Sequence, residues 1–156
     1  MRRGLAAALA LPLAGVAAPA PDHEEAAVYA AAGLVAAEGG WRRAGCATLF
    51  KPAIERLDVD RDGRDEFALF VGPSTCFAET ARGNVALFKR EPDGRWSERL
   101  GWAPGVEIVP TGASTAGHAD LGVATPGGCL AVFRWDGQRY VHALNRAIEP
   151  GGCQFR

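Results

Sequence analysis

Two segments of this chain have the pattern of a β-hairpin closed by a tight Asp-Gly turn. The first reads VALFKREPDGRW, at residues 85–96, and the second reads LAVFRWDGQRY, at residues 130–140. Asp-Gly between apolar runs is a strong hairpin signal, because these turns need residues that tolerate positive φ. Two such hairpins among other short apolar runs predict a mainly β fold with antiparallel pairing.

Similar tetrapeptides precede the two hairpins, EFAL at residues 66–69 and DLGV at residues 120–123. This similarity predicts two diverged antiparallel repeats, residues 57–99 and 117–143, each resembling a propeller blade. Two blades cannot close a ring, so we expect one compact domain over residues 21–156, ending in a C-terminal tail. The expected strands are Phe67–Val71, Val85–Lys89, Arg95–Glu98, Leu121–Ala124, Leu130–Arg134 and Arg139–His142.

One helix is expected before the strands, over residues 22–38. Asp22 is placed to act as its N-cap, with Glu25 three residues later as the capping-box partner. Small and apolar residues recur at helical spacing within it, and Gly39-Gly40 supplies a stop signal. The alanine-rich face of such a helix suits close packing on a sheet.

The first twenty residues, MRRGLAAALALPLAGVAAPA, have the composition of a signal peptide. Arg2 and Arg3 form a positive start, a short apolar run follows, and small residues then offer cleavage after residue 17 or residue 20. The apolar run is broken by Pro12 and is shorter than the roughly 20 residues that cross a bilayer. We therefore expect a periplasmic or secreted protein with no membrane span.

The chain contains four cysteines, and an even number in an exported chain favours disulfides. Three pairings into two bonds are possible, of which one closes the shorter loops: Cys46–Cys76 with Cys129–Cys153. A zinc site is the competing interpretation, but the chain has neither a C-x-x-C motif nor clustered histidines. Two disulfides are therefore expected.

The charge balance points to no polyanionic partner. Lys and Arg number 17 against 18 Asp and Glu, which gives a formal net charge of -1, and no basic stripe is present. Nucleic acid and anionic membranes are thus not expected partners.

The stretch LDVDRDGRDEFALF, residues 57–70, places several acids immediately before an expected strand. Carboxylates at alternate positions of a tight turn point toward one centre, and calcium takes 6–8 oxygen ligands at about 2.3–2.6 Å. A calcium ion is therefore predicted here, with a glycine at residue 63 for the bend. The expected ligand residues are Asp58, Asp60, Asp62, Arg64 through its carbonyl, and Glu66.

The segment DVDRDGRDEFALF resembles the calcium loop and strand of FG-GAP and VCBS repeats, and this resemblance implies one structural calcium site. More widely, the chain is similar to small exported bacterial proteins of unestablished function. The shared features are A-A-G at residues 31–33, Trp41 with Cys46, the acidic loop, a glycine-rich loop with a cysteine, R-W-x-G-x-x-Y at residues 134–140, and a terminal Cys153. The acids of the loop are missing from the second repeat, so one metal site is implied.

Two alternatives concern chemistry. The acidic turn is also explicable by side-chain-to-backbone hydrogen bonds and neighbouring arginines, without a metal. Ser114, His118 and Asp120 are the residue types of a hydrolase triad, but they share one short segment, and no G-x-S-x-G motif is present.

We therefore expect a non-enzymatic binding module rather than an enzyme. Its partner would be an unknown protein or a cell-envelope ligand, reached through loops such as residues 73–84 or 112–120. The alternative is a secreted hydrolase that uses the His118 segment or the metal site.

Overall fold

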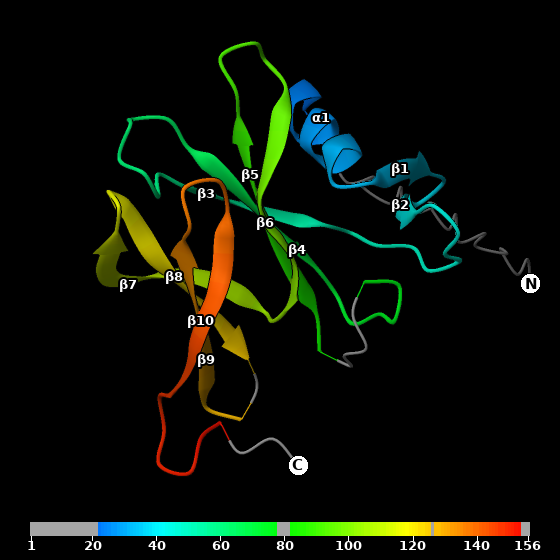
Figure 1. The fold of residues 1–156 in the computed structure, drawn as a ribbon. Coiled ribbons are helices and arrows are strands. Elements are labelled where there is room, and N and C mark those ends of the chain that lie inside the picture. The colour runs from blue at the N-terminus through cyan, green and yellow to red at the C-terminus, as the bar shows by residue number, and fades with distance from the viewer. Residues whose placement is uncertain (1–21, 78–81, 126, 154–156) are drawn as a thin grey trace, which may run out of the picture.

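The computed structural model describes residues 22–77, 82–125 and 127–153, so the predicted signal peptide lies outside the described part of the chain (Figure 1). The described residues form one helix and ten strands in three antiparallel sheets, which confirms the expected mainly β class. Within these residues, no helix is both long and apolar enough to span a bilayer.

The two larger sheets each have four strands that follow one another in sequence order. All six predicted strands are present within them. The strands β3 and β7, which each form one edge of a sheet, were not predicted from the sequence. The first sheet contains β3 (Ala53–Leu57), β4 (Glu66–Val71), β5 (Asn84–Arg90) and β6 (Trp96–Pro104). The second contains β7 (Glu107–Thr115), β8 (His118–Thr125), β9 (Cys129–Trp135) and β10 (Tyr140–Ala147).

The first sheet is the middle layer of the molecule. Figure 1 shows helix α1 (His23–Ala31) and the second sheet on different sides of it. Successive strand residues point to opposite faces, so Phe67 and Leu69 of β4 pack with the helix, while Ala68 packs with residues of the second sheet. A sheet covered on both faces reads as a continuous apolar run, which explains EFALFV in β4 and NVALF in β5.

The predicted helix is too long. Asp22 accepts the capping hydrogen bond from Glu25 N at 2.7 Å, as expected, but the helix ends at Ala31. Gly33 follows with φ +78°, the left-handed conformation that commonly ends helices. The remaining residues form a hairpin instead, with β1 (Leu34–Ala37) paired to β2 (Gly40–Arg43). The small and apolar residues fit this strand as well as a helix.

Both predicted disulfides form, in the pairing that closes the shorter loops. Cys46–Cys76 spans 30 residues and Cys129–Cys153 spans 24, and no described cysteine is free. The prediction of a loop over residues 112–120 is wrong: β7 runs to Thr115 and β8 begins at His118, so the segment is mostly a hairpin.

Candidate metal centre

The acidic loop connects β3 to β4 and lies at the junction of the two larger sheets. Val59 is buried within the core between the sheets. Its N–H donates to Glu66 Oε2 at 2.8 Å, and its carbonyl accepts from Ala119 N of β8 at 2.7 Å. The loop therefore joins the end of the first sheet to the second.

Side-chain oxygens of the loop accept hydrogen bonds from the loop backbone. Asp58 accepts from the N–H groups of Asp62 and Gly63, both at 3.1 Å. Asp62 in turn accepts from Arg64 N at 2.8 Å. Gly63 has φ +80°, so a side chain there would strain the bend. These are the hydrogen bonds that the metal-free interpretation predicted. Among the described residues they leave Asp60 Oδ2 and Asp62 Oδ2 without a backbone donor.

The side chain of Lys89 fills the space that those remaining oxygens face. Its ammonium donates to Asp60 Oδ2 and, at 2.7 Å, to Asp62 Oδ2. It also lies 3.2 Å from Glu66 Oε1 as an ion pair. One cationic atom is thus surrounded by oxygens from three of the predicted metal ligands.

Strand register explains why Lys89 reaches the loop. Phe67 of β4 pairs with Phe88 of β5, so one further step along each strand sets Glu66 opposite Lys89. Both side chains lie on the face turned toward the second sheet, which places a charged pair where its neighbours Ala68 and Leu87 are apolar.

The electrostatics of the cluster follow from burial and from this ammonium. Burial raises the pKa of Glu66 above its usual value, opposed by the Val59 N–H and by Lys89. Burial also disfavours the charged form of Lys89, but its carboxylate partners outweigh this effect and raise its pKa. The pKa of Asp62 is lowered, first by the hydrogen bond from Lys89 and then by the Arg64 N–H.

A small cavity of about 80 Å³ lies beside the cluster, between the sheets. His118 stacks on Trp135 there, with ring centroids 4.2 Å apart, and its Nε2 lies 3.9 Å from Asp60 Oδ2. Tyr140, on the same cavity, donates its hydroxyl proton to the Ala119 carbonyl at 3.0 Å. The second sheet thus contributes aromatic rings and an imidazole to the surroundings of the acidic loop.

The donor set fits calcium. Oxygen atoms of Asp58, Asp60 and Glu66 lie within 4.8 Å of one another, and carboxylates are the ligands that this hard cation prefers. Glu66 Oε1 is buried, and the cation that faces it is Lys89 Nζ at 3.2 Å. When bound, calcium would supply positive charge to the group of oxygens that faces Lys89. Asp62 lies within the same group, and the backbone N–H of Arg64 points at Asp62.

The residues of the alternative triad are not arranged as one. Asp120 pairs with Arg134 at 3.2 Å and accepts from the Thr115 hydroxyl at 2.7 Å. The His118 Nδ1 atom faces the Ala116 carbonyl at 3.2 Å. Among the described residues, no hydrogen bond joins Ser114, His118 and Asp120, so the geometry of a nucleophile with its base is missing.

Lys89, which reaches three carboxylates of the loop from β5, was not predicted from the sequence. A signal for it exists in VALFKR, where Val85 and Leu87 alternate with residues of the opposite face and Lys89 occupies the next core-facing position. A lysine in that position needs a carboxylate partner.

Comparison with known proteins adds no relative: no protein-family model, curated protein or solved structure matches the chain at a significant level.

Proposed function

We propose that this is an exported, non-enzymatic binding protein in which the acidic loop takes up one structural calcium ion. The observation that carries the proposal is the convergence of Asp60, Asp62 and Glu66 on one point, with Glu66 only 1% exposed. A buried carboxylate without full compensation is costly, so the site favours a cation of higher charge.

Charge balance supports a divalent ion over the lysine alone. Three carboxylates, from Asp60, Asp62 and Glu66, contact a single ammonium. An oxygen of Asp58 lies within 4.8 Å of oxygens of Asp60 and Glu66. In the calcium-bound protein Lys89 would leave the cluster, and Arg64 would offer its carbonyl as a further oxygen ligand. Because the loop bonds to Ala119 of the second sheet, an ion here would stabilise the junction between the sheets.

Export is supported by two features. The first twenty residues have the pattern of a signal peptide, and both disulfides suit an oxidising compartment. We therefore place the protein in the periplasm or outside the cell, where it would bind an envelope component or another protein.

The test is a calorimetric titration of the mature protein with CaCl₂. Wild type should bind one calcium, with a dissociation constant of about 10⁻⁴ M, as in extracellular calcium modules. The Asp60→Asn/Asp62→Asn double variant should lose this binding. Asp93→Asn is the matched control, since Asp93 lies in a distant turn and pairs with Arg95. Absence of calcium binding by wild type, or equal binding by the double variant, would contradict the proposal. The loop would then be an acidic turn held by its own hydrogen bonds, without a metal.

A further inference from the structure

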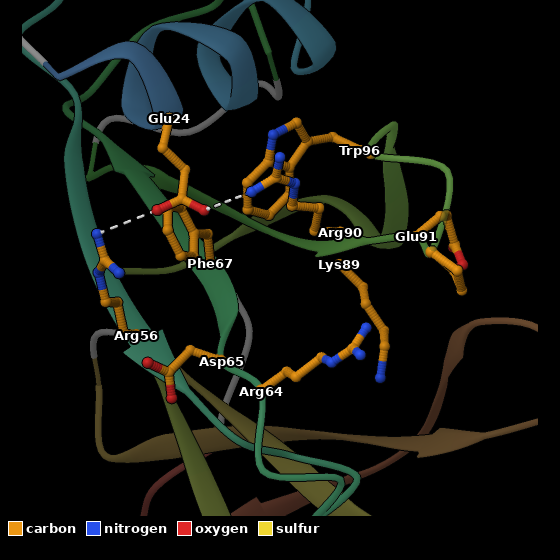
Figure 2. Close-up of a pocket in the computed structure, with 11 residues that line it drawn as sticks. Glu24, Arg56, Arg64, Asp65, Phe67, Lys89, Arg90, Glu91 and Trp96 are labelled. Carbon is orange, nitrogen blue, oxygen red and sulfur yellow. Dashed lines mark hydrogen bonds and ion pairs between the residues drawn. The ribbon is translucent and has the colours of Figure 1, made fainter.

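A second pocket lies beside the acidic loop, on the side of the first sheet that faces helix α1. It has a volume of about 400 Å³, within the range of small-molecule sites. Figure 2 shows its wall, formed by side chains from α1, from β3 to β6 and from the loop. The pocket is not the metal centre, although Lys89 borders both.

Arginines dominate the charge of this pocket. Arg56 and Arg90 both pair with one carboxylate, that of Glu24, at 3.5 and 3.4 Å. These distances exceed the roughly 2.7–2.9 Å of strong charge-assisted hydrogen bonds, and the arginines are about half exposed. Exposed pairs of this kind contribute little, so an incoming anion can replace them at small cost.

A third arginine points into the pocket without a partner. The Arg64 guanidinium makes no hydrogen bond or ion pair within the described residues, and Figure 2 shows it extending toward the same side of the pocket as Lys89. Glu91, another acid of the lining, is already engaged by Arg99 at 2.6 Å and by the Ser97 hydroxyl. The three arginines of the lining therefore share two carboxylates, those of Glu24 and Asp65, which leaves one positive charge in excess.

An aromatic side chain supplies an apolar surface in the pocket. The Trp96 indole lines the pocket and packs on Phe67, with ring centroids 4.6 Å apart. Since Phe67 is buried, it is the partly buried indole that offers an apolar surface. An indole face accepts flat or ring-shaped groups, and guanidinium groups bind carboxylates and phosphates through two parallel hydrogen bonds.

From this geometry we propose that the pocket binds a small molecule that carries a carboxylate or phosphate group on a ring. Arg64 binds the oxyanion, Arg90 adds positive charge from the part of the pocket near Glu24, and Trp96 packs against the ring. This assignment does not depend on calcium uptake by the loop, because the three arginines and the indole are in place beside a loop closed by Lys89.

The experiment is a calorimetric titration of the mature protein in excess chelator, which removes any contribution from calcium. The probes are glucuronate, glucose 6-phosphate and neutral glucose. One or both anionic sugars should bind at least about tenfold more tightly than glucose, the difference expected of charged hydrogen bonds. The tighter of the two identifies the oxyanion.

Two variants test the residues. Arg64→Gln should weaken anion binding about tenfold or more, and Trp96→Leu should weaken binding of the anionic sugar. Arg42→Gln, at an exposed arginine of β2, is the control and should bind as wild type does. The proposal is overturned if the anions bind no better than glucose, or if Arg64→Gln keeps the wild-type affinity.

Discussion

The Nζ atom of Lys89 lies 3.2 Å from Oε1 of Glu66, and the two residues are cross-strand neighbours at the end of β4 and β5. Glu66 is 1% exposed, yet this oxygen accepts no hydrogen bond from the described residues. This ammonium and the Val59 N–H, which donates to Oε2, are therefore the two groups that compensate the buried negative charge. Every expectation about the acidic loop depends on this pair.

The pair predicts a strong effect of removing the lysine in the absence of calcium. Lys89→Met leaves the Glu66 carboxylate buried without its cation and should lower the free energy of unfolding by about 2 kcal/mol. Adding Glu66→Gln to the same variant removes the buried charge and should recover part of the loss. Urea unfolding in excess chelator measures both. Equal stability of wild type and Lys89→Met would show that the ammonium does not compensate Glu66.

We expect the stability of the protein to fall at alkaline pH because of Tyr140. Its hydroxyl donates to the Ala119 carbonyl, and burial, followed by the charges of Glu66 and Asp60, raises its pKa above the usual tyrosine value of about 10. The pKa of Tyr140 is higher in the folded than in the unfolded state. The stabilisation contributed by its neutral hydroxyl is therefore fully present below pH 10 and is lost as the pH rises above it.

The variant Tyr140→Phe isolates this contribution. At pH 8 it should be about 1 kcal/mol less stable than wild type, because the Ala119 carbonyl loses its donor. At pH 11 the difference should shrink, since wild type must keep a buried phenol neutral while the phenylalanine has no proton to lose. Urea unfolding at both pH values checks this. A difference that stays constant with pH would contradict the role given to the hydroxyl proton.

The close approach of the two large sheets predicts a steric effect at Gly105. A Cβ atom there would lie 2.2 Å from Val123 Cγ1 and 3.1 Å from the Ala124 carbonyl oxygen. Gly105→Ala should therefore cost about 2 kcal/mol through overpacking. Gly72→Ala is the matched control, since a Cβ atom there meets nothing within 4 Å and the backbone is not in a left-handed conformation. Thermal unfolding of the two variants should separate them clearly, and similar melting temperatures would argue against the tight sheet junction.

Lys89 borders both proposed sites, which predicts that they are coupled. Calcium in the loop releases the ammonium toward the arginine-lined pocket, so the affinity for the anionic sugar should rise severalfold in calcium. By reciprocity, the bound anion should raise the affinity for calcium by the same factor. Titrations in calcium and in chelator measure this effect. In Lys89→Met the affinity for the anion should not respond to calcium, and a wild-type affinity that also fails to respond would mean that the sites act separately.

Much of the fold follows from local sequence patterns. The Asp-Gly turns fix the two hairpins that contain β5 with β6 and β9 with β10, and the apolar runs locate the central strands. The edge strands β3 and β7 were not predicted because neither has a clear apolar face. Ala53–Leu57 has only exposed and half-buried residues, and Glu107–Thr115 has one buried residue, Ile108. The short helix was overextended, since the small and apolar residues after Gly33 suit either structure and only pairing with β2 decides between them.

The candidate site was predictable where it is local. The spacing of Asp58, Asp60 and Asp62 before Gly63 is visible in one short segment, and the structure brings their carboxylates together with Glu66. Lys89 was not predicted because it joins the loop only through the register of β4 against β5. The second pocket depends in the same way on tertiary contacts, since Glu24 of the helix meets Arg56 and Arg90 from two different strands.

The central claim is that calcium and the Lys89 ammonium are alternative occupants of one group of carboxylates. Thermal unfolding of Lys89→Met in chelator and in about 10 mM CaCl₂, beside wild type, tests it most directly. In chelator the variant should melt about 5–10 °C below wild type. Calcium at about 100 times its dissociation constant adds about 2.7 kcal/mol to the free energy of unfolding and should restore the melting temperature of the variant fully. The rise in melting temperature should be larger in the variant than in wild type, because in wild type the ion must displace the lysine. A variant that stays destabilised at every calcium concentration would contradict the claim.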